Sequence, residues 1–214
     1  MIVCFTADQA VYLEWEEIDW YDRLYFQMYL AFVKTIKVEG AGFSKPITFT
    51  LDNSKSDQSE GVNTDRLEVY ADGKQIDYDI YYTKMSGDIV KENAAYNFHR
   101  LFKAFQLASL GGVADLTDAQ LSSINNTPDS ECLLKFTVIS DDGKGNTEYT
   151  VYRFYAYTER KAYMTIEVLD SPNAASDPAR AQGRFYVSRS FCEKLTADVH
   201  RFLDGVEIVV ESKN

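Results

Sequence analysis

The sequence predicts an α+β protein in which antiparallel β-sheets carry helices packed on one face. Several stretches rich in Tyr, Phe and Val alternate with period two, which is typical of strands with one buried face. Other segments place apolar residues at the i, i+3, i+4 and i+7 spacing of an amphipathic helix. The 214 residues, 45% of them hydrophobic and 26% charged, are enough to bury a substantial core.

The N-terminal part is expected to consist mainly of strands. A short helix is expected at 22–31, before the first of them. Period-two patterns then predict strands at 32–38, 47–51, 66–71 and 76–82. All four prolines of the chain fall at predicted strand starts or in loops, which is consistent with these boundaries.

A long amphipathic helix is expected over 92–110. Its apolar residues share one face, and Gly111-Gly112 is expected to end it because glycine favours the position after a helix. The helix therefore packs its apolar face against a sheet. The large residues expected on that face are Phe98, Leu101, Phe102 and Phe105.

Two further helices are predicted from their start signals. The segment Thr117–Ile124 begins with an N-cap threonine and has Gln120 three residues on, which is a capping box. The last helix is expected to begin at Ser190, with Glu193 completing another box, and to end at Gly205. Its buried face is expected to comprise Leu195, Val199, Phe202 and Leu203.

The C-terminal part predicts an antiparallel meander. Strands are expected at 132–140, 146–158, 161–169 and 184–188. The segment 141–146, rich in Gly, Asp and Asn, suits a hairpin turn between the first two.

The order of predicted elements repeats, because a set of strands followed by a helix recurs about 100 residues later. This order suggests two related units, although two meanders with helices can also arise independently in a mixed α+β chain. We therefore expect a β-rich half at 1–85 and an α+β half at 86–214, or one continuous domain containing both.

The charge balance argues against nucleic acid as a partner. The chain has 22 Lys plus Arg and 33 Asp plus Glu, which gives a net charge of −11. A protein that binds nucleic acid needs a basic face to displace counterions from the phosphates.

No catalytic, cofactor or metal residues are predicted. Cys192 and His200 share the last helix but lie eight residues, about 12 Å, apart along its axis, so they cannot form a nucleophile–base pair there. A hydrolase is therefore disfavoured. The scattered cysteines are expected to be small buried hydrophobes, and both histidines to be partly exposed.

Two acidic segments are candidate ligand sites. The loop from Asp52 to Asp65 is rich in the oxygen ligands that Ca²⁺ favours, but it fails the EF-hand pattern and carries Lys55 at its middle. The segment 14–22 combines carboxylates with Trp15 and Trp20, as sugar sites do. A solvated surface is favoured for each, and metal binding at the first stays open.

Several strings stand out in the chain: 151–163, Gly183-Arg184-Phe185-Tyr186-Val187 with its following helix, the tail ending Ser212-Lys213-Asn214, and 32–38, 48–53 and 92–98. Together they resemble a bacterial family known as domain of unknown function 4340. The resemblance extends over roughly residues 11–214, and its motifs are structural, so no catalytic residue is carried over from it.

The resemblance implies a function outside the cytoplasm. Members of this family typically carry an N-terminal transmembrane anchor and are encoded beside gliding-motility-type ABC transporter subunits. We therefore expect either the C-terminal portion of a longer, membrane-anchored protein or a divergent short member of the family. In both cases the expected role is a non-catalytic accessory module that contacts permease or ATPase subunits. The alternative is a ligand-binding module that captures a surface glycan or a peptide through exposed aromatic residues.

Overall fold

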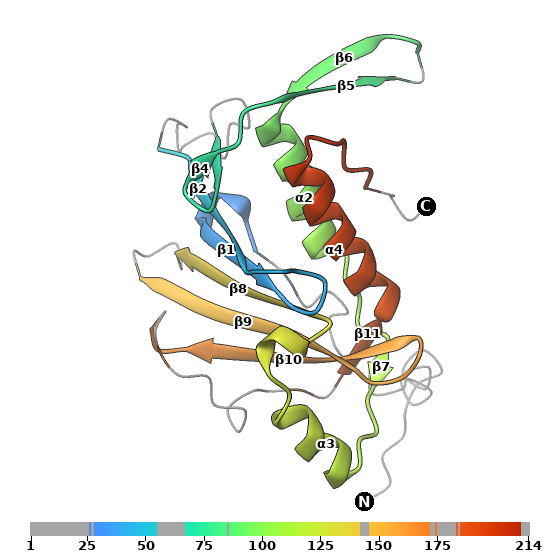
Figure 1. Ribbon diagram of the computed structural model, residues 1–214. Coiled ribbons are helices and arrows are strands. Elements are labelled where there is room, and N and C mark those ends of the chain that lie inside the picture. The colour runs from blue at the N-terminus through green and yellow to red at the C-terminus, as the bar shows by residue number, and fades with distance from the viewer. Residues whose placement is uncertain are drawn as a thin grey trace, which may run out of the picture.

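The computed structural model describes residue 26 and residues 28–54, 67–84, 86–141, 146–171, 174, 183 and 185–210. In these residues, nine strands form one antiparallel sheet, and two further strands form a separate hairpin (Figure 1). The two longer helices pack on one face of the large sheet. The α+β class predicted from the sequence is therefore confirmed.

The large sheet comprises β1 (Val33–Glu39), β2 (Ile47–Asp52), β3 (Glu68–Ala71), β4 (Lys74–Gln75), β7 (Gly112–Val113), β8 (Leu134–Asp141), β9 (Thr147–Ala156), β10 (Lys161–Leu169) and β11 (Phe185–Ser188). The separate hairpin comprises β5 (Asp79–Thr83) and β6 (Ile89–Asn93). The α-helices are α2 (Ala94–Gln106), α3 (Asp118–Asn125) and α4 (Arg189–Leu203), and short 3₁₀ turns lie at η3 (Leu30–Phe32) and η5 (Asp129–Glu131).

Antiparallel pairing between β1 and β8 joins the two predicted halves of the chain. The strand order is β4-β3-β2-β1-β8-β9-β10-β11-β7, so β1 and β8 lie near the middle of one continuous sheet. Ile36 pairs with Val138, and Val38 pairs with Phe136. Each half contributes a meander whose strands are followed along the chain by a helix. Two related units would produce this order, but the internal repeat itself stays a prediction.

The main core lies between the sheet and the helix pair α2 and α4. Alternation along the strands points Phe49 of β2 toward the helices, where it meets Phe98 of α2 and Phe202 of α4. The three ring centroids are 5.4–5.6 Å apart in edge-on geometry, which aromatic pairs favour. Most of the residues predicted on the two helix faces are confirmed as core, being at most 2% exposed: Phe98, Leu101, Phe102, Phe105, Leu195, Val199 and Phe202. Leu203, which was also expected to be buried, is only half-buried at the edge of this core.

The first long helix is shorter at both ends than the sequence predicts. It begins at Ala94, where the Asn93 side chain accepts a hydrogen bond from the backbone of Tyr96. It ends at Gln106, so the expected stop at Gly111-Gly112 is wrong. Glycine at 111 instead makes room for the Tyr186 ring, since a Cβ added at Gly111 would lie only 2.7 Å from that ring.

The capping signals of the other two helices gave different outcomes. The box at α3 is confirmed, with the Thr117 hydroxyl accepting from the Gln120 backbone and the Gln120 side chain accepting from the Thr117 backbone. The box at α4 is wrong: the helix begins at Arg189, and Glu193 forms an ion pair with Arg189 at 3.1 Å. Gly205 lies just after this helix with φ +71°, as expected of a helix stop.

Two predictions near the N-terminal half need correction. Of the expected helix at 22–31, residues 22–25 and 27 lie outside the described residues, and the described end forms a 3₁₀ turn at η3. The expected strand at 76–82 is confirmed only from Asp79. Its partner strand β6 is not predicted from the sequence, because its last two residues fall within the helix expected over 92–110.

Substitution of Phe102 tests this packing. Its side chain is 2% exposed and contacts Phe26 with ring centroids 5.7 Å apart. Phe102→Ala removes a buried ring and leaves a cavity, so it is expected to lower the free energy of unfolding by about 3–5 kcal/mol in denaturant titrations. Leu107→Ala, just beyond the same helix and 44% exposed, is the matched control and should cost less than about 1 kcal/mol. A loss of that smaller size for Phe102→Ala would contradict the assigned helix face.

Candidate functional site

The face of the sheet turned away from α2 and α4 carries charged residues instead of a hydrophobic core. The strand register places Glu39 of β1 beside Lys135 of β8, Lys135 beside Arg153 of β9, and Arg153 beside Thr165 of β10. These four residues therefore form one row across four strands. Lys135, Arg153 and Thr165 are each less than 10% exposed, so much of this row is buried although it is polar.

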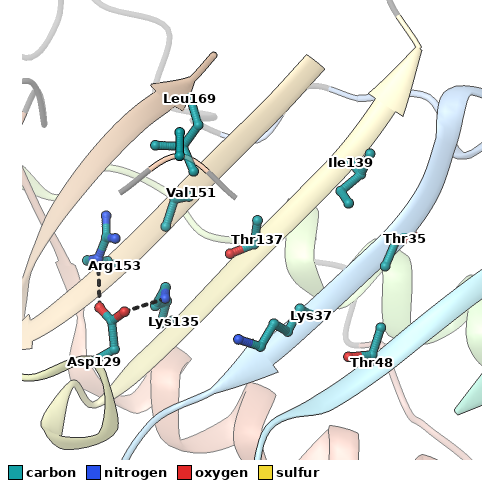
Figure 2. Close-up of a pocket in the computed structure, with 11 residues that line it drawn as sticks. Thr35, Lys37, Thr48, Asp129, Lys135, Thr137, Ile139, Val151, Arg153 and Leu169 are labelled. Carbon is teal, nitrogen blue, oxygen red and sulfur yellow. Dashed lines mark hydrogen bonds and ion pairs between the residues drawn. The ribbon is translucent and has the colours of Figure 1, made fainter. Parts of the chain in front are cut away.

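Two like charges are direct neighbours in this row. Lys135 and Arg153 occupy a cross-strand pair, and cations at such positions repel each other. Asp129 of η5 lies over them and bridges both (Figure 2). Its Oδ2 accepts from Lys135 Nζ at 2.5 Å, and its Oδ1 accepts from Arg153 Nε at 3.0 Å. The bridging carboxylate thus compensates the repulsion between the two cations.

Two further carboxylates complete the network. Glu39 accepts from Lys135 at 2.6 Å and forms a second ion pair with Lys37 at 3.2 Å. At the other end of the row, Glu167 accepts from the Arg153 guanidinium at 2.8 Å. Three cations and three carboxylates are thereby linked without a break.

The pKa shifts follow from this arrangement. Burial alone would raise the pKa of Asp129, but hydrogen bonds and charge attraction from Lys135 and Arg153 outweigh it and lower the pKa below the ordinary 3.8. For Arg153, burial acts to lower the pKa, and the carboxylates of Asp129 and Glu167 more than offset it, so its pKa is raised. Asp129 and Arg153 are therefore both held in their charged forms.

A small second core places Asp129 over the sheet. Ile124 of α3 packs with Cys132, Tyr155 and Tyr163, and this cluster covers the end of the open face next to the ionic network. The chain then turns through η5, where the Cys132 backbone N–H donates to the Asp129 carbonyl at 3.3 Å. Burial raises the pKa of Cys132 to about 11, so this thiol stays protonated and acts as an apolar side chain.

Beside the network lies a hollow of about 290 Å³. Polar and aliphatic side chains both line it, and the strand register places them next to one another, with Thr35 beside Ile139 and Thr137 beside Val151 (Figure 2). The polar lining consists of Thr35, Lys37, Thr48, Asp129, Lys135, Thr137 and Arg153. The apolar lining consists of Ile139, Val151, Leu169 and Ala174.

A second exposed feature is the β5–β6 hairpin, which projects from the body of the protein (Figure 1). On its inner side, Arg100 of α2 lies 4.8 Å from the Tyr82 ring and forms an ion pair with Glu92 at 2.7 Å. On its other side, Tyr81 is 63% exposed and Ile89 is 75% exposed. No described strand pairs with the outer edge of either strand, so both edges remain open in that part of the chain.

The structure places the predicted site residues only in part. The acidic segment 14–22 lies outside the described residues, as do residues 55–65 of the Asp52–Asp65 loop, while the Asp52 side chain accepts from the backbone of Ser54. No group of three metal-ligating side chains occurs among the described residues. Whether the loop binds metal stays open.

Two of the cysteines and both histidines lie among the described residues. Cys132 and Cys192 are buried free thiols, as expected, and Cys4 lies outside the described residues. His99 is half-buried, and His200 is exposed and hydrogen-bonds the Gly42 carbonyl at 3.1 Å.

The ionic network was not foreseen as a site. The signal that could have found it is the charged side chain at strand positions flanked by apolar residues, as in Lys135, Arg153 and Glu167. A strand with one face on the core and one face in water shows the same alternation, so the pattern alone does not distinguish a buried ion network from a solvated face.

Comparison with known protein families gave no match, and neither the curated proteins nor the solved structures yielded one. The resemblance to domain of unknown function 4340 therefore stays a prediction. No helix in the described part of the chain combines the length and apolar character needed to cross a bilayer.

Substitution of Asp129 tests the ionic network. Asp129→Asn keeps the shape of the side chain but leaves Lys135 and Arg153 with one carboxylate fewer between them. We expect the free energy of unfolding at pH 7 to fall by about 2 kcal/mol, less than for a fully buried pair, because the Asp129 side chain is 42% exposed. Asp77→Asn, at an exposed position, is the control and should change stability by less than about 0.5 kcal/mol.

The difference in stability between the wild type and Asp129→Asn is expected to depend on pH. Because the folded-state pKa of Asp129 is lowered, its stabilising contribution is present above the unfolded-state pKa and is lost as the pH falls through the folded-state value. The stabilities of the wild type and Asp129→Asn should therefore converge below about pH 4. A constant difference down to pH 2 would contradict the network.

Proposed function

We propose that the chain is a non-catalytic interaction module and that the β5–β6 hairpin is its contact surface. The observation that carries the proposal is the projecting hairpin with open edges and exposed Tyr81 and Ile89. Exposed strand edges pair readily with other chains, and aromatic residues are favoured at interfaces. A two-stranded hairpin is only marginally stable by itself. Arg100 of α2 fixes this hairpin through its contacts with Tyr82 and Glu92, which supports a functional role for the hairpin in this position.

The proposed partners are permease or ATPase subunits of an ABC transporter. This part of the proposal rests on the family resemblance, which also suggests an extracytoplasmic position and an anchor in a longer protein. The hairpin supports contact with a protein, because its two surfaces, an open backbone edge and an exposed aromatic–aliphatic pair, both suit another polypeptide.

A second candidate function is ligand binding, and the hollow beside Asp129 is the observation that favours it. The predicted means of binding needs revision, because none of the described lining residues is aromatic. The exposed aromatic residues lie elsewhere, at Tyr29 and Phe32 near η3 and at Tyr81 on the hairpin. A ligand in the hollow would instead meet ammonium, hydroxyl and aliphatic groups.

Site-specific crosslinking tests the interaction proposal. A photoreactive amino acid is placed at Tyr81 in the full-length gene product in its native host, and crosslinked proteins are identified after irradiation of membranes. We expect permease or ATPase subunits of an ABC transporter to be recovered at least tenfold above a non-irradiated sample. Val168 is the matched control position, because it is 67% exposed but lies on β10 of the large sheet.

Two outcomes would contradict the proposal. Equal recovery of the transporter subunits from Tyr81 and Val168 would show that the hairpin is not the contact surface. Recovery of none of them from Tyr81, with the protein still in the membrane fraction, would exclude the proposed partners and favour the ligand-binding candidate.

A further inference from the structure

The polar lining of the hollow is centred on Lys37. The strand register places Thr48 on one side of Lys37 and Thr137 on the other, and Thr35 lies two residues away on the same face of β1. Three threonine residues therefore lie beside Lys37 on the floor of the hollow. Figure 2 shows the Lys37 side chain extended toward the ionic network.

Lys37 is the accessible cation of the site. Its side chain is 41% exposed, whereas those of Lys135 and Arg153 are 9% and 5% exposed. Within the part of the chain that the structure describes, its ion pair is with Glu39 at 3.2 Å, and Lys135 holds the same carboxylate at the shorter distance of 2.6 Å. Lys37 thus keeps donor capacity for a ligand, since an ammonium group has three N–H donors.

The three neighbouring hydroxyls can act with it. Within the described residues, the side chains of Thr35, Thr48 and Thr137 have no hydrogen-bond partner, although all three line the hollow. A hydroxyl can donate one hydrogen bond, and bonds that join an ammonium or hydroxyl donor to a carboxylate are stronger than those between neutral groups.

Aliphatic side chains beside these threonines suit an aliphatic group. Ile139, Val151 and Leu169 lie on neighbouring strands of the same face, and none of them has a side-chain polar atom. Three of the four charged residues that line the hollow are cations, but carboxylates pair with all three, so the attraction for an anionic ligand comes from the exposed ammonium group of Lys37 and not from a net positive charge. The volume of about 290 Å³ is at the small end of ligand sites.

We propose that the hollow binds a small carboxylate with an aliphatic body, with the carboxylate held by Lys37 and the surrounding threonines and the aliphatic group held by Ile139, Val151 and Leu169. This inference rests on the ligand-binding candidate above. The shared chemistry fits both a free N-acylated aliphatic amino acid and the C-terminal residue of a peptide.

Binding of matched probes to the 214-residue chain, followed by NMR titration and calorimetry, tests the inference. N-acetyl-L-leucine is expected to bind, and N-acetyl-L-leucinamide, which has the same shape but no charge, is expected to bind about tenfold more weakly. The peptide Gly-Gly-Leu distinguishes the two sources: tighter binding than N-acetyl-L-leucine supports a peptide C-terminus, and weaker binding supports a free acid. Shifts of the Thr137 and Val151 amides would locate either probe in the hollow.

Lys37→Gln is expected to weaken binding of N-acetyl-L-leucine about tenfold and to leave binding of the amide within twofold. Lys34→Gln is the matched control: Lys34 lies on the same strand, is 45% exposed, and forms an ion pair with Asp141 at 3.1 Å, but it is not among the described residues that line the hollow. Equal affinities for the acid and the amide, unchanged by Lys37→Gln, would overturn the carboxylate assignment while leaving the hollow a ligand site. Failure of both probes and the peptide to bind at 10 mM would overturn this inference and the ligand-binding candidate, and would leave the interaction role of the hairpin unaffected.

Discussion

The neighbouring cations Lys135 and Arg153 impose the constraint on which the open face of the sheet depends. Two buried like charges in a cross-strand pair are tolerated only if carboxylates compensate them. Asp129 supplies the shared carboxylate, and it reaches them because α3 and η5 pack over the end of the sheet. The packing of α3 and η5 on the sheet and the charge of the sheet face beneath them are therefore linked. The hollow lies beside η5, where Asp129 is one of its lining residues.

The two faces of the sheet are stabilised in different ways. The face under α2 and α4 buries aromatic side chains, such as Phe49 against Phe98 and Phe202, and hydrophobic burial there dominates the stability of the fold. The open face buries charge, which contributes less to stability but fixes geometry, because each ion pair requires defined positions of both partners. A stable core on one face thus supports a polar surface on the other whose groups hold fixed positions.

Much of the fold could be predicted from the sequence because strand alternation and helix spacing are local signals. The faces of α2 and α4 and the capping box at Thr117 follow from residues close together in the chain. The β5–β6 hairpin could be predicted only in part: β5 overlaps the strand expected at 76–82, whereas the signal for β6 is obscured by the helix that follows it at once. The Asp129 network could not be predicted, since Asp129 is 24 residues from Arg153 and meets it only in the tertiary structure. The hollow is lined mostly by residues of predicted strands, but the strand pairing that brings their side chains together is a tertiary feature.

The most direct test of this account is the pKa of Asp129 in the folded protein. The ¹³C chemical shift of its carboxyl group, followed by NMR as the pH is lowered, reports that ionisation alone. If the carboxylate bridges Lys135 and Arg153 as described, its titration midpoint lies below the ordinary value of 3.8. A midpoint at or above 3.8 would mean that burial outweighs the two cations, and the account of the open face would be wrong.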